Sequence, residues 1–201
     1  MDGEIMETNI LENMQIEEIF KNNILLDLFD KDFHFDIENE KHKQIVKSLK
    51  SYNRMYELFD KINYIDDIVF IIINTEESLF PLLGYLININ IDKIKQILNH
   101  PNINKKHVNF IIDTLSLEQI ERDIEILEIG ISKGYQFNEH TIELLEKNRD
   151  LLIQKLNSFS DNSQELLLLV NNLSDKVLND NLVVNLIITN GYYFTKDTPQ
   201  I

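Results

Sequence analysis

The sequence predicts an all-α protein built of helix-turn-helix repeats that stack in chain order. Residues 28–36 recur thirty residues later as residues 58–66, with five identities in nine positions. Apolar anchors after comparable turns are spaced 30, 38 and 34 residues apart: Phe35, Ile65, Ile103 and Phe137. Only five Gly and three Pro occur in 201 residues, too few for a sandwich of many short strands. Periods of this length are typical of stacked units that cannot bury their apolar faces alone.

Six repeats are expected along the chain. We predict a short mobile end over residues 1–8 and a single repeat domain over residues 9–197. Each repeat is predicted to consist of a helix, a turn, a second helix and a polar loop. The repeats fall at roughly 9–38, 39–68, 78–105, 113–139, 140–169 and 170–197. The same pattern is compatible with another α-solenoid or with an irregular helical bundle.

The third repeat shows why its residues favour a helix. Ile94, Ile97 and Leu98 stand at i, i+3 and i+4, so they share one face. Asp92 suits the first turn, because the helix dipole is positive there. Pro101 lacks a backbone N–H and cannot continue the helix, so a turn is predicted at residues 100–102.

The fourth and last repeats end their helices at glycine. Ile124, Leu127 and Ile131 repeat the apolar spacing of the third repeat. Gly134 then follows where a helix end needs a left-handed residue, and Gly191 has the same role in the last repeat.

The apolar run over residues 68–73 permits two interpretations. Its β-branched residues would suit a strand. Its position directly before the polar residues 74–77 favours a buried helix instead, and this is the interpretation we adopt.

Residues 80–138 resemble ankyrin repeats. Pro81 and Leu82 match the Pro-Leu of the family pattern Thr-Pro-Leu-His-x-Ala. Asn104 occupies the position of the asparagine that ends the family's repeat. Residues 123–138 are similar to the second half of such a repeat. The resemblance implies degenerate ankyrin-like helix pairs and a role in binding other proteins. Three residues replace the Thr, His and Ala of the pattern: Phe80, Leu83 and Tyr85.

Composition excludes several classes of function. Cysteine is absent, which removes disulfides and thiolate metal sites. Acids outnumber bases 34 to 19, and a net charge of −15 argues against nucleic acid or an anionic membrane as partner. The apolar runs are far shorter than the roughly 18–20 residues of a membrane span. No basic segment precedes an apolar stretch, so we expect a cytoplasmic protein.

The residue usage also points to an AT-rich coding genome. Isoleucine occurs 31 times, asparagine 24 times and alanine not at all. A large DNA virus, an amoeba or an AT-rich bacterium would fit. In a virus or an effector-secreting bacterium, the expected compartment is the host cytoplasm.

The sequence offers little that could carry catalysis. None of the five histidines forms an H-E-x-x-H motif or an i, i+4 pair, so no metal site or cofactor is expected. Residues 30–40 are acidic like a calcium loop, but Phe35 stands where the loop needs glycine. No P-loop, G-x-G-x-x-G or G-x-S-x-G occurs. We therefore expect a protein that is not an enzyme.

Candidate contact residues lie on the predicted turns, which form the edge of a repeat array. Tyrosine there would offer contact area at low rotamer cost. Tyr135 and Tyr192 follow the helix-ending glycines and could instead pack on the next repeat. The candidates for partner binding are His34, Tyr64, Asn102, Tyr135, Gln136, Tyr192 and Tyr193.

Acidic residues are concentrated near the N-terminus. Residues 1–40 carry twelve acids against two lysines, a net charge of −10. The expected acidic patch consists of Asp30, Asp32, Asp36, Glu38 and Glu40. We expect a non-enzymatic intracellular protein–protein interaction module, and the ankyrin resemblance implies a host-directed adaptor. The alternative is an acidic inhibitor or immunity protein that neutralises a basic toxin or nuclease.

Overall fold

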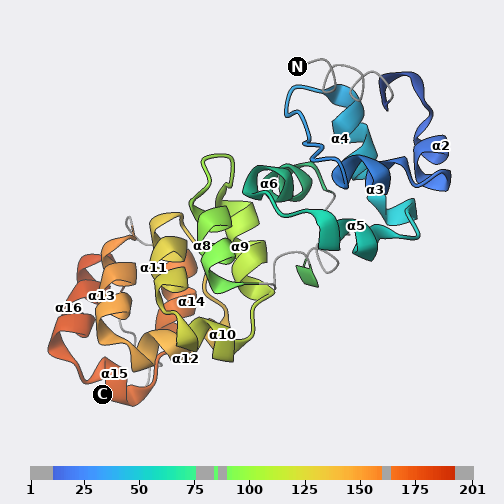
Figure 1. Cartoon of the computed structure of the whole chain (residues 1–201). Helices are drawn as coiled ribbons and strands as arrows, with labels where there is room; N and C mark the ends of the chain where they lie inside the picture. The colour runs from blue at the N-terminus through green and yellow to red at the C-terminus, as the bar shows by residue number, and fades with distance from the viewer. Residues whose placement is uncertain (1–10, 76–83, 86–89, 160–163, 193–201) are drawn as a thin grey trace. The chain divides into compact units, whose positions relative to one another are not determined.

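The computed structural model describes residues 11–75, 84–85, 90–159 and 164–192. Over these residues the chain forms helices joined by turns and loops, with no strand, which confirms the all-α prediction (Figure 1). The chain divides into two compact units, Met1–Thr114 and Leu115–Ile201, whereas the sequence suggested one continuous domain. The mobile end expected over residues 1–8 lies outside the described residues.

The first unit consists of short helices packed against their near neighbours along the chain. α2 packs on α3, α3 on α5, α4 on α6, and α6 on α8, which in turn packs on α9. The elements with described bounds are α2 (Ile16–Lys21), α3 (Ile24–Phe29), α4 (Glu40–Lys47), a 3-10 turn (Leu49–Ser51), α5 (Met55–Lys61), α6 (Ile65–Asn74), α8 (Ile91–Asn99) and α9 (Lys105–Asp113).

The central helix of the first unit is α6. It contains the apolar run over residues 68–73, so the helical interpretation is confirmed. Five consecutive residues from Ile68 to Ile72 are buried, which places neighbours around most of its circumference. α8 follows the predicted pattern, with Ile94, Ile97 and Leu98 all fully buried.

Asparagine side chains cap the N-termini of three helices of the first unit. Asn39 accepts hydrogen bonds from the backbone N–H groups of two residues in α4, and Asn90 accepts one from Asp92 in α8. Asn104 forms a reciprocal capping box with His107 at the start of α9. Each cap satisfies N–H groups that have no partner inside the helix. Part of the unusual asparagine content therefore has a structural role.

The second unit repeats this local packing. α10 packs on α12, α11 and α12 on α13, α12 on α14, and α16 on both α13 and α15 (Figure 1). The elements are α10 (Leu117–Arg122), α11 (Glu125–Ser132), α12 (Glu139–Lys147), α13 (Arg149–Asn157), α14 (Gln164–Asn172), α15 (Asp175–Leu178) and α16 (Asn181–Thr189).

Both predicted glycine stops occur in this unit. Gly134 has φ 82° and Gly191 has φ 84°, the left-handed region that glycine adopts without a steric cost. After α11, the N–H of Tyr135 donates to the carbonyl of Gly130 and the N–H of Gly134 to that of Ile131. The same two bonds close α16 at Tyr192 and Gly191. Each stop is therefore a Schellman motif.

A buried lysine joins α13 to the end of α11. The Lys155 ammonium donates to the carbonyl of Tyr135 at 3.0 Å and to the Glu165 carboxylate at 2.7 Å. It also lies 4.7 Å from the centre of the Phe159 ring. These contacts compensate for taking the charge out of water, so this ion pair has a structural role.

Repetition is visible in the capping residues and in the long-range hydrogen bonds. The capping boxes of α9 and α12 begin at Asn104 and Asn138, 34 positions apart. In the first unit, His34 bonds to Asp67 at a separation of 33 residues, and His100 to Asp66 at 34. In the second unit, Arg149 bonds to Asp180 at 31 residues. One repeat therefore contacts the next through similar positions, which gives a repeat-like array of helices.

Candidate functional site

Three of the predicted contact residues meet along one edge of the first unit. The Tyr64 ring packs edge-on against the His34 ring, with 4.2 Å between their centres. The Nδ1 atom of His34 lies 2.8 Å from Oδ2 of Asp67. A carboxylate only accepts, so this nitrogen carries the proton and donates it. The other oxygen of Asp67 accepts the backbone N–H of Phe35 at 2.7 Å.

The next turn continues this edge. Nδ1 of His100 accepts the backbone N–H of Asn102 at 3.2 Å, so in the neutral ring Nε2 carries the proton. That nitrogen lies 3.1 Å from Oδ1 of Asp66 and donates to it. Asp66 and Asp67 are neighbours in the first turn of α6, where carboxylates suit the helix dipole. We call these six residues the turn edge: His34, Tyr64, Asp66, Asp67, His100 and Asn102.

The turn edge combines fixed and exposed groups. Asp67 is almost fully buried, whereas the Asp66 side chain is 91% exposed. Tyr64 keeps 53% of its surface exposed and His34 about half of its side chain. The buried carboxylate therefore positions rings that remain available for contact.

A groove with an apolar floor adjoins the turn edge. It has a volume of about 390 Å³, and its floor includes the rings of Phe35 and Phe70, which stack with centres 5.0 Å apart. Ile37 contributes a side chain that is 44% exposed. We call it the α6 groove; its lining residues are Phe35, Asp36, Ile37, Asp66, Val69, Phe70, Ile73, His100 and Asn102.

Two of the predicted contact tyrosines are core residues, which corrects the expectation that they face a partner. Tyr135 is 0% exposed and packs edge-on against Phe137, and Tyr192 is 8% exposed with its hydroxyl bonded to Asn171. Each follows a Schellman glycine, and the closing backbone bond draws this position back onto the helix. Gln136 is exposed on the second unit, and Tyr193 lies outside the described residues.

The acidic patch is exposed but partly neutralised within the chain. Asp30 forms an ion pair with Lys61, and Glu40 forms one with Lys43 at 2.7 Å. The hydrogen bond from Lys43 lowers the pKa of Glu40. Asp36 fixes the following turn by accepting the backbone N–H of Glu38. Among the described residues, the exposed acids of the patch that form no ion pair are Asp32, Asp36 and Glu38.

Sequence reasoning missed several residues of this surface. Asp67 directly precedes the apolar run over residues 68–73, and a carboxylate at the start of a buried helix was a signal for a polar partner. The sequence placed His100 on a turn but did not indicate that its ring bonds to Asp66 in the first turn of α6. Outside the turn edge and the α6 groove, Tyr56 and Tyr85 form a second exposed aromatic pair with 5.1 Å between ring centres, for which turn positions gave no indication.

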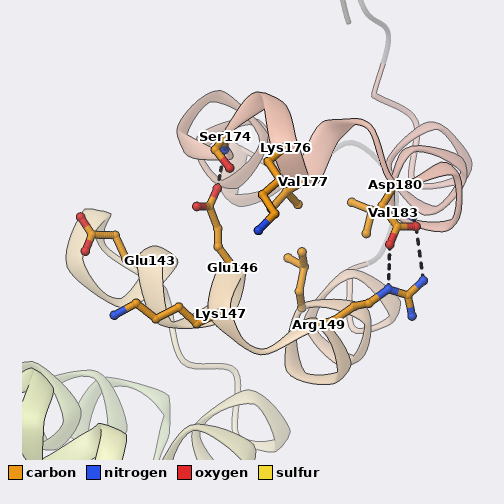
Figure 2. A pocket seen from close by; sticks show the side chains of 10 residues that line it. Glu143, Glu146, Lys147, Arg149, Ser174, Lys176, Val177, Asp180 and Val183 are labelled. Carbon is orange, nitrogen blue, oxygen red and sulfur yellow. Dashed lines mark hydrogen bonds and ion pairs between the residues drawn. The ribbon is translucent and has the colours of Figure 1, made fainter.

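The second unit contains a larger hollow of about 570 Å³. Figure 2 shows Arg149 reaching Asp180 and Glu146 reaching the backbone of Ser174. Lys147, on the rim, pairs with Glu121 at 2.8 Å. Three of its six charged side chains, Lys147, Arg149 and Asp180, therefore form ion pairs within the same unit.

The described residues bring no three metal-binding side chains together. They also contain no helix long and apolar enough to cross a membrane. Comparison with protein-family models, with curated proteins and with solved structures found no match. The turn edge and the α6 groove are thus the features on which a functional proposal can rest.

Proposed function

We propose that this chain is a non-enzymatic protein–protein interaction module, made of degenerate ankyrin-like repeats, that binds its partner through the turn edge. The observation that carries the proposal is a connected set of contacts along this edge. Tyr64 packs on His34, which bonds to Asp67, and the neighbouring Asp66 bonds to His100, which also holds the backbone of Asn102. These residues come from three successive turns, so the edge exists only in the folded array. Pre-ordered aromatic and imidazole rings lose little entropy when a partner binds.

The surface chemistry supports binding rather than catalysis. Tyrosine and histidine rings offer contact area with few rotamers, as in the central residues of protein interfaces. The His34 and His100 imidazoles bond to aspartates, which orders both rings for contact with a partner.

The cytoplasm is the proposed place of action. The lack of cysteine fits a reducing compartment, and the composition fits an AT-rich genome. If the protein is viral or an effector, we propose a host-directed adaptor in the host cytoplasm.

An acidic inhibitor of a basic toxin or nuclease is the second candidate. It is favoured by the exposed carboxylates of Asp32, Asp36 and Glu38 and by the −10 charge of residues 1–40. It is disfavoured by the pairing of Asp30 and Glu40 with lysines of the same unit. Such an inhibitor would lose association rate steeply as salt rises.

The test is partner capture by matched variants. The immobilised full chain is incubated with extract of the native host, and captured proteins are identified by mass spectrometry. The double variant His34→Ala/Tyr64→Ala removes both exposed rings of the turn edge, and we expect it to lose the specific partner. Tyr56→Ala is the matched control, because Tyr56 is a similarly exposed tyrosine outside the turn edge.

Each outcome separates the two candidates. Loss of capture in the double variant, with retention in Tyr56→Ala, supports the interaction module. If Asp32→Lys/Glu38→Lys alone abolishes capture and the double variant binds normally, the acidic inhibitor replaces it. If all of these variants capture the partner as well as the wild type does, binding through the turn edge is refuted.

A further inference from the structure

We propose that the α6 groove is a specificity pocket that receives an arginine side chain from a protein partner. The inference rests on the proposed function and adds the chemistry of the residue recognised. It follows from three properties of the groove: its apolar floor, the signs of its charges and the fixed orientation of its carboxylates.

The floor suits the aliphatic part of a long side chain. Ile37 and Ile73 retain accessible surface, and the buried Val69 is a further apolar lining residue. A volume of about 390 Å³ is at the small end of ligand pockets, which span roughly 300–1,000 Å³. The groove therefore has room for one long side chain. Arginine and lysine cover apolar surface with their stems while their charged heads remain near water.

The charges of the groove select a cation. Its lining includes two carboxylates, Asp36 and Asp66, and no lysine or arginine. The remaining polar lining residues are His100 and Asn102. An anionic residue would be repelled here, and an apolar residue would leave the carboxylates without a counter-charge.

The carboxylates are held in place before a ligand arrives. Oδ1 of Asp66 accepts from His100, and Oδ1 of Asp36 accepts from the backbone N–H of Glu38. Within the described part of the chain, both of these hydrogen bonds use Oδ1, and Oδ2 of each carboxylate accepts none. A guanidinium presents several N–H donors in one rigid plane and can also stack on the aromatic floor. Arginine therefore fits the groove better than lysine, whose ammonium is a compact, strongly hydrated charge.

The experiment uses the full chain, labelled with ¹⁵N, and capped peptides as probes. One peptide is acetyl-Gly-Leu-Arg-Leu-Gly-amide. A second carries citrulline, which keeps the shape of arginine without its charge, and a third carries lysine. We expect the arginine peptide to shift the amide signals of Ile37, Asp66 and Val69. Binding of the citrulline peptide should be at least about tenfold weaker, with lysine between the two.

Matched variants locate the site. Asp66→Asn and Asp36→Asn remove one charge each, and both should weaken binding of the arginine peptide several-fold. Asp27→Asn is the control, since Asp27 is an exposed acid on α3 of the same unit and lies outside the groove. Dispersed amide spectra confirm that each variant is folded.

Three results would overturn the inference: no shifts at millimolar peptide, equal shifts with the citrulline peptide, or an equal loss in the Asp27→Asn control. The proposed function is judged separately. If Asp66→Asn still captures the partner while His34→Ala/Tyr64→Ala does not, the interaction module stands and arginine recognition fails. If neither variant affects capture and no peptide binds, both proposals fail.

Discussion

Asp67 shows how a single buried carboxylate can fix a surface. Its two oxygens accept from the His34 ring and from the backbone of Phe35, and both donors come from the preceding repeat. A hydrogen bond to a charged acceptor contributes roughly 1.5–3 kcal/mol, and removing Asp67 would leave two partly buried donors without this acceptor. The position of the turn edge therefore depends on a residue that a partner would hardly touch.

His42 is a second buried polar residue, close to the same turn. Its Nδ1 accepts the backbone N–H of Asp36 at 2.9 Å, so the neutral ring carries its proton on Nε2. Nε2 is buried and has no hydrogen-bond partner among the described residues. Burial lowers the pKa of His42, while the negative charges of Asp36, Glu12 and Asp67 act weakly in the opposite sense.

The lowered pKa of His42 predicts a loss of stability in mild acid. An unfolded chain takes up this proton below about pH 6.5, whereas the folded chain resists it until a lower pH. The stabilisation is therefore complete above about pH 6.5 and declines as pH falls from there towards the folded pKa. His42→Asn keeps an acceptor for Asp36, so we expect its free energy of unfolding to fall less between about pH 7.5 and 5.5.

Urea unfolding at a series of pH values measures this difference. Part of the slope should remain in the variant, because burial also lowers the pKa of His107. His140→Asn serves as the control, since His140 is exposed on α12, and it should keep the wild-type slope. An identical pH dependence in His42→Asn and the wild type would contradict the prediction.

At the scale of elements, the sequence predicted helices well where periodicity and a stop signal agreed. Ile94, Ile97 and Leu98 lie on one buried face, and α8 ends just before Pro101 as expected. The glycine stops were also predictable, because left-handed helix ends favour glycine. Burial of Tyr135 followed from the same motif, which draws its last residue towards the helix. The sequence was compatible both with this packing and with a contact role for Tyr135, and its complete burial leaves the packing role.

The candidate site was less predictable, because it depends on tertiary distance. Nothing local indicates that His34 would meet Asp67, or that His100 would meet Asp66, since about one repeat separates each pair. Turn positions alone identified His34, Tyr64 and Asn102. They could not show the groove, whose floor requires α6 to lie between two turns.

The asparagine caps give a prediction for single helices. The side chain of Asn138 accepts the N–H of Thr141, and Thr141 accepts the N–H of Asn138 in return. Asn138→Ala should destabilise the chain by about 1 kcal/mol, because an unpaired N–H remains at the start of α12. Asn138→Asp should be nearly neutral, since a carboxylate also caps and suits the dipole.

Denaturant titration with circular dichroism detects this difference. Asn157→Ala removes an exposed asparagine from the last position of α13 and controls for loss of the residue type. The capping account fails if Asn138→Asp destabilises as much as Asn138→Ala, or if the control costs the same.

At the scale of the whole molecule, stability is expected to be local along the chain. Helices of each compact unit pack mainly on elements close in sequence, and the long-range bonds recur after about one repeat. In such arrays the free energy of folding is close to a sum over repeats and the contacts between neighbours. A defect should therefore weaken its own repeat and the adjoining ones more than distant ones.

Leu98→Ala tests this expectation. Leu98 is fully buried in α8, which packs on α6 and α9, so the variant loses transfer free energy and gains a cavity. The cost should be roughly 2–5 kcal/mol. Hydrogen exchange should show the largest loss of protection in α6, α8 and α9, with little change in α13 and α16 of the second unit. Gln96→Ala, an exposed position on the same helix, should leave protection unchanged. Equal loss across both units would mean that the molecule unfolds as one cooperative body, and the local account of its stability would then be wrong.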